Sequence, residues 1–265
     1  MDFLKLEHEM RSLALQAGAQ IMQVYDGPDF DIRTKSDASP VTQADEAANR
    51  LIAEGLRAAF PDVPLITEEE SESHALRAKT FLIVDPLDGT KEFIQRRGDF
   101  TVNIAYVANG VPIRGIVYAP AKARLFYTNA AGVSVEEMGP HRVQDIGQTR
   151  PISVKATPDN AALRVVASKS HRDVATDDYI AKYKVQDMTS AGSSLKLCLI
   201  ATGEADLYPR LGRTMEWDTA AGDAVLRGAG GRMVRFDTHE TLDYGKDNWE
   251  NPFFIGYAPG VVLHK

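Results

Sequence analysis

The chain has 265 residues and a net charge of −7 at neutral pH, with 44% hydrophobic and 25% charged residues. This balance is ordinary for a globular protein, and the length fits one large domain or two modest ones. The acidic charge argues against nucleic acid as a partner, because such binding depends on basic patches. No apolar run approaches the roughly 20 residues of an integral membrane segment.

The single cysteine, Cys198, excludes an internal disulfide, and its apolar surroundings predict a buried and inert thiol. The N-terminal segment is charged and amphipathic, and it lacks the apolar core and cleavage site of a signal peptide. These features predict a cytoplasmic protein by default. They leave open whether it also contacts the cytoplasmic membrane peripherally.

The first half of the chain predicts helices packed on an antiparallel sheet. Apolar spacings of three and four indicate amphipathic helices over 3–25 and from Ala44 to about Phe60. An irregular polar loop or hairpin separates them. Strands are expected at 64–67, 81–84, 100–108, 111–120, 123–128 and 133–138. An Asn-Gly turn at 109–110 predicts that two of these strands form a hairpin.

A change in composition near residue 150 predicts a boundary between an N-terminal half, 1–150, and a C-terminal half, 151–265. Beyond it, the pattern alternates between strands and helices, which is typical of an α/β arrangement with a mixed or parallel sheet. Strands are expected at 163–168, 184–190, 205–210 and 232–236. Helices are expected at 173–183, 193–203 and 219–230.

The sequence DPLDGT, which starts at Asp85, follows an apolar run and is the first candidate site. We predict that the strand ends before Asp85 and that the proline and glycine turn Asp88 back towards it. The two carboxylates and the Leu87 carbonyl can supply one side of the octahedral oxygen shell of Mg²⁺. The N–H groups of Gly89 and Thr90 would face an anion at a helix start. The alternative is a routine turn in which Asp88 caps that helix.

Three consecutive glutamates follow the short strand at 64–67. Glu68 comes directly after this strand, so its carboxylate is a candidate for the second element of a two-metal site. Glu69 is a weaker candidate than Glu68. The alternative is a capping box between Thr67 and Glu70, which leaves Glu68 unexplained.

Two further acids stand at expected helix starts. Asp218 precedes a helix with a face of small residues, and Asp45 follows a polar loop that holds Lys35 and Asp37. The alternative is again capping, with Asp218 as an N-cap and Asp45 paired with Thr42. The polar loop could instead fold over a metal site as a lid.

The motifs SPVTQAD, TEE, DPLDGTKEF and WDTAAGDAVL, in this order, resemble those of the inositol monophosphatase family of magnesium-dependent, lithium-sensitive phosphatases. With Lys35, they span residues 35–228. The resemblance implies an α+β/α/β fold, the layered αβαβα sandwich of sugar phosphatases. It also implies a cofactor of two or three Mg²⁺ ions.

Within the family, the chain is most similar to the 3'(2'),5'-bisphosphate nucleotidases. Lys91-Glu92 stands where inositol phosphatases show a different pair, and the segments GSSLK, from Gly192, and VVASKSH, ending at His171, resemble nucleotidase segments. The implied reaction removes the 3'-phosphate of adenosine 3',5'-bisphosphate, a by-product of sulfate assimilation. The alternatives are an inositol monophosphatase, a fructose 1,6-bisphosphatase-type enzyme, or a non-catalytic phosphonucleotide and metal sensor.

Site roles follow from the resemblance, residue by residue. The implied metal ligands are Glu68, Asp85, the Leu87 carbonyl, Asp88 and Asp218. The implied catalytic residues are Asp45 and Thr90, which would position and deprotonate the attacking water, together with Glu68. The implied substrate-binding residues are Leu87, Asp88, Gly89, Thr90, His171, Gly192, Ser193, Lys196, Arg210 and Asp218. For Lys196 the alternative is a solvated surface lysine. Monomer and homodimer are both compatible with the sequence.

Overall fold

The structure is a computed structural model that describes residues 1–27, 32–34, 40–170 and 172–265. Three residues singled out by the sequence, Lys35, Asp37 and His171, lie outside the described residues. Only the backbone is described for the short antiparallel pair β1 (Ile32–Thr34) and β2 (Pro40–Thr42).

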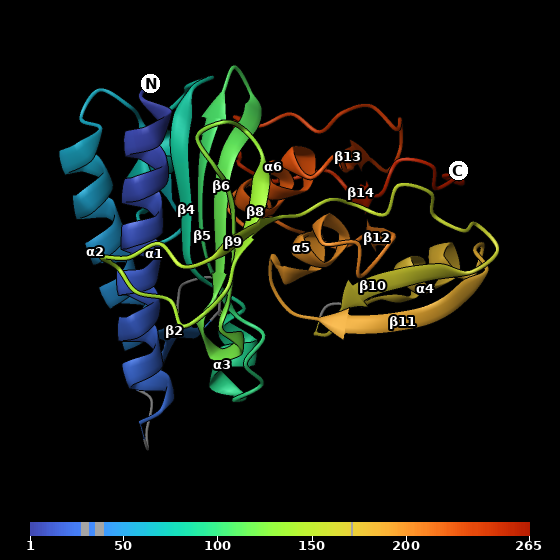
Figure 1. The fold of residues 1–265 in the computed structure, drawn as a ribbon, viewed down its shortest axis with the longest axis horizontal. Coiled ribbons are helices and arrows are strands. Elements are labelled where there is room, and N and C mark those ends of the chain that lie inside the picture. Colours follow the sequence, from blue (N-terminus) through green and yellow to red (C-terminus); the bar gives the residue numbers. More distant parts are fainter. Residues whose placement is uncertain (28–31, 35–39, 171) are drawn as a thin grey trace.

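Two long helices form the outermost layer on the N-terminal side (Figure 1). They are α1 (Phe3–Tyr25) and α2 (Gln43–Ala59), which confirms both helix predictions. Asp2 caps α1 by accepting hydrogen bonds from the N–H groups of Leu4 and Lys5 at 3.0 and 3.1 Å. Neither these nor the other described helices are long and apolar enough to cross a membrane.

The first sheet has seven strands in the order β3-β4-β5-β6-β7-β8-β9. Their bounds are β3 Leu65–Thr67, β4 Phe81–Asp88, β5 Thr101–Ala108, β6 Val111–Ala119, β7 Arg124–Thr128, β8 Ser134–Glu137 and β9 Thr149–Pro151. All neighbouring pairs are antiparallel except β3 and β4, which run parallel. The sheet is therefore mixed, rather than wholly antiparallel as predicted.

The predicted hairpin joins β5 to β6. Asn109 and Gly110 both have positive φ angles, 52° and 78°, as a two-residue type I′ turn requires. Both faces of this hairpin are buried, because alternate side chains point to opposite sides of the sheet. Val102 and Ile104 pack towards α1 and α2, whereas Ala105 and Val107 pack on the other face.

The second sheet has five strands in the order β11-β10-β12-β14-β13, with both parallel and antiparallel pairs. Its strands are β10 Leu163–Ser168, β11 Val185–Ala191, β12 Leu207–Arg210, β13 Arg232–Arg235 and β14 Phe254–Tyr257. The helices of this half are α4 Val174–Ile180, α5 Leu195–Ala201 and α6 Ala220–Gly228. The mixed α/β prediction is confirmed, but the sequence analysis missed β14.

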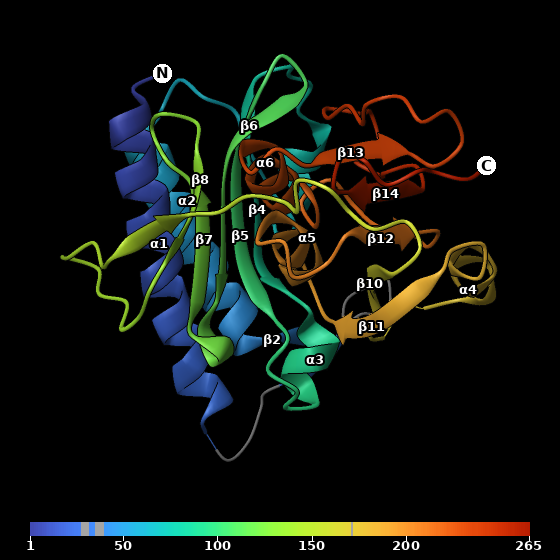
Figure 2. The ribbon, with the colours of Figure 1, turned by 45° about the vertical axis from the view of Figure 1, so that its right-hand side comes forward.

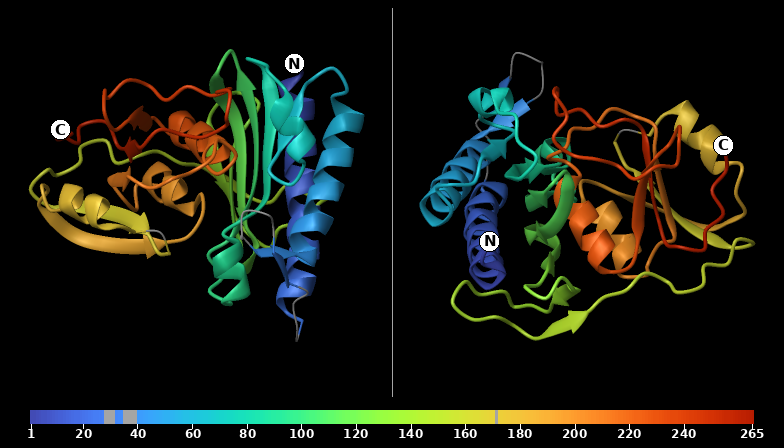
Figure 3. Two further views of the ribbon diagram at one scale, coloured as in Figure 1. Left: turned by 180° about the vertical axis from the view of Figure 1, so that it is seen from behind. Right: turned by 90° about the horizontal axis from the view of Figure 1, so that it is seen from above.

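The elements stack as helices, sheet, helices, sheet and helix, which confirms the layered αβαβα sandwich (Figures 1, 2 and 3). One hydrophobic cluster lies between α1, α2 and the first sheet, and another between the second sheet and α4. The largest cluster fills the space between the two sheets, around α5 and α6. Cys198 lies in this cluster with no exposed surface, and burial raises the pKa of its thiol, as expected for an inert cysteine.

Close packing of α6 on β6 depends on Gly115. A Cβ atom at this position would lie 2.4 Å from the carbonyl oxygen of Ala221. The absence of a side chain therefore lets the helix rest directly on the strand. Helix α6 thus lies on β6 and β5, and the loop before it carries Asp218.

Candidate active site

The segment DPLDGT does not form the predicted turn at its start. Strand β4 continues through Asp88, and Asp85 pairs with Asn103 while Asp88 pairs with Thr101. Three steps along β4 thus oppose two along β5, which is a β-bulge. The strand was predicted to end before Asp85. It continues to Asp88 because the extra residue is accommodated in a bulge, which also changes the direction of the side chains. Proline is tolerated at a bulge, where no ladder N–H is needed.

The turn comes one residue after Asp88, at Gly89. Gly89 has a φ angle of +91°, and a Cβ there would lie 2.9 Å from the carbonyl oxygen of Asp99. The short helix α3 (Thr90–Ile94) follows, with Gly89 rather than Asp88 at its N-cap position. The capping alternative for Asp88 is therefore wrong. The Thr90 hydroxyl donates a hydrogen bond of 3.2 Å to the Leu87 carbonyl.

Asp88 and Asp218 both contact the loop that precedes α5. The N–H of Ser194 donates to Asp88 Oδ2 at 2.8 Å, and its hydroxyl donates to the Asp218 carbonyl at 2.7 Å. The Asp218 side chain accepts the N–H of Met215 at 2.7 Å, and Thr219 occupies the N-cap position of α6. Asp218 thus closes a tight turn and is not the N-cap of α6, so that alternative is also wrong.

The capping box at the glutamates is wrong as well. The Thr67 hydroxyl donates to Asn49 Oδ1 at 2.5 Å, and the Glu70 carboxylate pairs with Arg57. The N–H of Glu68 donates to the Val84 carbonyl at 3.1 Å, which extends the β3–β4 ladder by one residue. This bond places Glu68 at the same end of the sheet as Asp85.

Five acids lie close enough to affect one another. Burial raises the pKa of Asp85 well above its usual range, and the charges of Glu68, Asp88, Asp218 and Asp45 raise it further. Burial likewise raises the pKa of Asp218, with contributions from Asp88 and Glu68. Burial raises the pKa of Asp88 to about 6, although the Lys196 charge opposes the shift. Asp45 and Asp85 are buried and the other three acids are half-buried. Such a set of oxygen donors suits a hard divalent cation.

The side chains do not form a closed coordination shell. Among the described residues, no group of three histidine, cysteine or acidic side chains has the spacing of a metal site. The fit to magnesium therefore depends on the donor chemistry and on the proximity of the acids, whose charges raise one another's pKa. Of the other implied ligands and catalytic residues, Asp45 is 1% exposed and Leu87 is equally buried, so both lie beneath the cavity surface.

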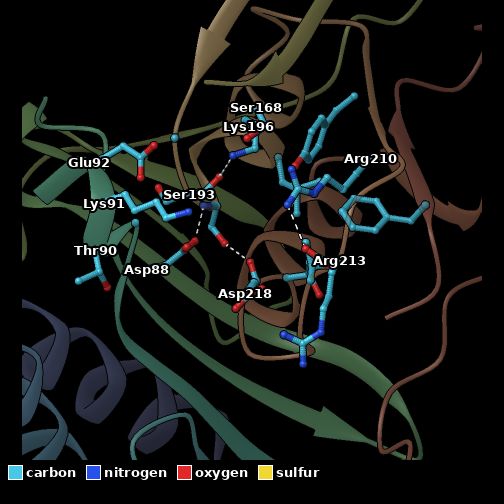
Figure 4. A pocket seen from close by; sticks show the side chains of 18 of the residues that line it. Asp88, Thr90, Lys91, Glu92, Ser168, Ser193, Lys196, Arg210, Arg213 and Asp218 are labelled. Atoms are coloured by element: carbon cyan, nitrogen blue, oxygen red, sulfur yellow. Dashed lines mark hydrogen bonds between the residues drawn. The ribbon is translucent and has the colours of Figure 1, made fainter. Parts of the chain in front are cut away.

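A cavity of about 240 Å³ opens beside these acids (Figure 4). It brings together nine of the predicted residues: Glu68, Asp88, Gly89, Thr90, Gly192, Ser193, Lys196, Arg210 and Asp218. Lys196 and Arg210 lie on the side of the cavity away from Thr90 (Figure 4). We call the side with Glu68, Asp88 and Asp218 the acidic end and the side with Lys196 and Arg210 the basic end, although Lys91 and Arg213 also line the cavity.

Lys196 is 6% exposed, so the alternative of a solvated surface lysine is wrong. Its ammonium group donates to the Ser193 carbonyl at 2.6 Å and lies 5.5 Å from the centre of the Tyr208 ring. Burial lowers its pKa to about 8, against the opposing effect of the Asp88 charge. Arg210 donates to the Arg213 carbonyl at 3.0 Å.

The sequence analysis missed several residues that line the cavity: Ser168, Tyr208, Arg213, Thr214 and Phe254. Ser168 and Tyr208 lie within strands that were predicted, so their position at a strand end was available as a signal. Phe254 could not have been found, because its strand was not predicted.

Glu92, from the Lys91-Glu92 pair, connects the two halves. It is 3% exposed and accepts a hydrogen bond from the Ser170 hydroxyl. Nearby, Lys169 forms an ion pair of 2.9 Å with the buried Asp99. Both contacts hold the segment after β10 against the segment that follows β4.

Comparison with known proteins gives four results. The sequence pattern of the inositol monophosphatase family matches residues 5–252. A 3'(2'),5'-bisphosphate nucleotidase CysQ from Escherichia coli is 44% identical over 246 residues, covering 91% of this chain and 95% of that protein. The crystal structure of CysQ from Bacteroides thetaiotaomicron has a TM-score of 0.82 at 38% identity, covering 95% and 96% of the two chains. An inositol monophosphatase from Anabaena shares the fold, with a TM-score of 0.74 at 23% identity over 98% and 93%.

Proposed function

The chain belongs to the inositol monophosphatase family, and we propose that it is a Mg²⁺-dependent phosphatase that converts adenosine 3',5'-bisphosphate to AMP and phosphate. The observation that carries this proposal is that one cavity is lined by the acids Glu68, Asp88 and Asp218 and, on the side away from Thr90, by the cationic side chains of Lys196 and Arg210. A substrate with two separated phosphates matches both ends. The identity of 44% to a bisphosphate nucleotidase supports the same substrate class.

The acidic end would hold the metal. We propose that two or three Mg²⁺ ions bind through oxygens of Glu68, Asp85, Leu87, Asp88 and Asp218. Bound Mg²⁺ would neutralise the phosphate charge and lower the pKa of the attacking water. The backbone arrangement supports this role, because the bulge of β4 and the Ser194 contact hold Asp88 towards the cavity.

Thr90 and Asp45 would handle the proton of the attacking water. The Thr90 hydroxyl donates a hydrogen bond to the Leu87 carbonyl, and its oxygen can also accept a hydrogen bond from a water molecule. Asp45 is buried at the start of α2 and its charge reaches the acid cluster. For general-base catalysis the Thr90 hydroxyl would turn its own proton from the Leu87 carbonyl to the Asp45 carboxylate while its oxygen accepts the proton of the attacking water.

The basic end would hold the 5'-phosphate and the nucleoside. Lys196 and Arg210 supply positive charge, and Gly192 and Ser193 border the same space. Tyr208 and Phe254 border this space, but the two residues are only 4% and 1% exposed. A monophosphorylated inositol does not require the two cationic side chains. His171, which the resemblance also assigns to this end, stays a prediction because it lies outside the described residues.

One assay separates this function from its rivals. Phosphate release is measured from adenosine 3',5'-bisphosphate, inositol 1-phosphate and fructose 1,6-bisphosphate, with Mg²⁺ and with added Li⁺. We expect the bisphosphate nucleotide to be hydrolysed fastest and Li⁺ to inhibit. Faster turnover of either sugar ester would assign the chain to that activity, and no turnover of any substrate would favour the sensor. A cytoplasmic location and a monomeric or dimeric state stay predictions.

A further inference from the structure

The side chain of His74 contacts the backbone directly before Glu68. Its Nε2 lies 2.9 Å from the carbonyl oxygen of Thr67, the residue that ends β3. A carbonyl can only accept, so Nε2 carries the proton of this hydrogen bond. His74 belongs to the short 3₁₀ helix η1 (Ser71–Ala75), which follows the glutamates. The ring therefore reaches back to the strand that positions Glu68.

The same ring contacts the residue directly before Asp218. It stacks on the indole of Trp217 with a centroid distance of 4.8 Å and an angle of 22°. Trp217 is 6% exposed, so the stack is largely shielded from solvent. The backbone of His74 is fixed separately, because Trp249 Nε1 donates to its carbonyl at 2.9 Å. His74 thus joins a strand of the first sheet to the loop that carries Asp218.

The contacts continue from Thr67 to the helix that carries Asp45. The Thr67 hydroxyl bonds to Asn49, which lies four residues after Asp45 on α2. Residues four apart lie on the same face of a helix. Asn49, Thr67, His74 and Trp217 therefore form one continuous chain of contacts, and we call it the His74 chain.

Three acids of the proposed active site are each attached close to a member of the His74 chain. Asp45 lies one helical turn from Asn49, and Glu68 and Asp218 directly follow Thr67 and Trp217. Like charges held together in a buried site repel one another, so their backbones need rigid support. The His74 chain connects helix, strand and loop at the point where this support is needed.

We propose that His74 is a positioning residue that sets the spacing of Glu68 and Asp218 for magnesium. The inference rests on the proposed Mg²⁺-dependent function and extends it to a residue that would not itself touch metal or substrate. Groups that orient metal ligands from outside the coordination shell typically change metal affinity by about 10- to 100-fold when they are removed.

The test uses two substitutions that remove different parts of the contact. His74→Phe keeps the aromatic ring for stacking but loses the hydrogen bond to Thr67, and His74→Ala loses both. His141→Phe is the matched control, because His141 also bonds to a backbone carbonyl, that of Glu137 at 2.9 Å, and packs on an aromatic ring, that of Tyr118 at 5.5 Å. Glu137 is the last residue of β8, and neither His141 nor its two partners line the cavity.

The readout is Mg²⁺ binding to the full, chelator-treated chain without substrate, by calorimetry and by the Mg²⁺-dependent rise in Tm. We expect His74→Ala to raise the dissociation constant about tenfold or more, and His74→Phe to give an intermediate value. His141→Phe should stay within about twofold of wild type, as expected for a substitution away from the site.

Unchanged Mg²⁺ affinity in His74→Ala, with only a lower Tm, would reduce His74 to a packing residue. If His74→Ala does not fold, the same comparison is made with His74→Phe, and wild-type affinity there would overturn the inference. Equal weakening by His141→Phe would overturn it too, because the effect would then be general. If the wild-type chain neither binds Mg²⁺ nor releases phosphate, the proposed function is refuted instead. There would then be no metal site for His74 to position.

Discussion

The backbone N–H of Ser194 donates a hydrogen bond of 2.8 Å to Oδ2 of Asp88, across 106 residues of chain. This bond ties the end of β4, in the first sheet, to the loop before α5. Asn103 Nδ2 contacts the same oxygen at 3.3 Å. Two neutral groups therefore donate hydrogen bonds to the Asp88 carboxylate. They leave its negative charge in place, so a cation can still bind to it.

Replacing Asp88 by asparagine tests whether its charge is needed for catalysis. The amide oxygen can still accept the Ser194 N–H, so we expect Asp88→Asn to stay folded. Mg²⁺-dependent phosphate release should fall by about 100-fold or more, since even outer-shell changes at metal sites cost up to about that much. Turnover and Tm are measured together, with Asp237→Asn, at an exposed carboxylate paired with Arg235, as the control. Wild-type turnover in Asp88→Asn would remove it from the metal site.

The raised pKa of Asp88 predicts how the metal-free protein responds to pH. Burial raises this pKa to about 6 in the folded chain, whereas an unfolded aspartate titrates near 4. Between these values the folded state binds more protons, so the free energy of unfolding contributed by this group falls as pH rises. The chelator-treated wild type should therefore lose Tm relative to Asp88→Asn as the pH rises from about 4 to about 6, the window set by these two pKa values.

Melting curves of both proteins across this range, with and without Mg²⁺, measure the effect. We expect added Mg²⁺ at the upper end of the range to raise the Tm of wild type more than that of the variant. Parallel pH profiles for the two metal-free proteins would show that Asp88 titrates normally.

Lys196→Met tests the second phosphate site, because methionine keeps most of the side-chain volume and removes the charge. Loss of a charge-assisted hydrogen bond costs about 1.5–3 kcal/mol, which is about 10- to 100-fold in affinity. We expect KM for adenosine 3',5'-bisphosphate to rise by this factor, while kinetics with a nucleoside 3'-monophosphate change little. An equal loss on both substrates would mean that Lys196 supports the fold of the Ser193 loop, whose carbonyl it contacts at 2.6 Å.

Gly192→Ala tests the close approach of the two halves beside the cavity. A Cβ at Gly192 would lie 2.4 Å from the carbonyl oxygen of Asp99 and 3.0 Å from Cγ of Glu92. Backbone contacts this short force a shift, so we expect lower Tm and at least about tenfold lower kcat/KM, since small misplacements of a site are costly. Gly212→Ala is the matched control, because its Cβ would come no closer than 3.5 Å, to the flexible side chain of Arg210. Equal behaviour of the two variants would mean that the predicted contact does not constrain the site.

Much of the architecture follows from local signals in the sequence. The amphipathic spacing over 3–25, the Asn109-Gly110 turn and the alternation of strands and helices after residue 162 each produced the element that the structure contains. The motifs around Glu68, Asp85 and Asp218 also identified the acids that gather at one end of the first sheet. Such signals are reliable because period and turn geometry depend on neighbouring residues. The division near residue 150 stays a prediction.

Only the tertiary structure decided what these motifs do in space. The spacing of Thr67 and Glu70 was compatible with a capping box, yet Asn49 binds the threonine and Arg57 binds the glutamate. Likewise, the strand was predicted to end before Asp85, but pairing with β5 carries it through a bulge to Asp88.

The physical reason is the range of the interactions. The sequence by itself determined which residues carry oxygen donors and which segments form helices and strands, because those properties are local. It could not determine which distant group meets each side chain, since such pairings depend on how the layers pack. The Ser194 bond to Asp88 and the burial of Lys196 exist only because α5 packs between the two sheets, with its N-terminal loop against the end of β4.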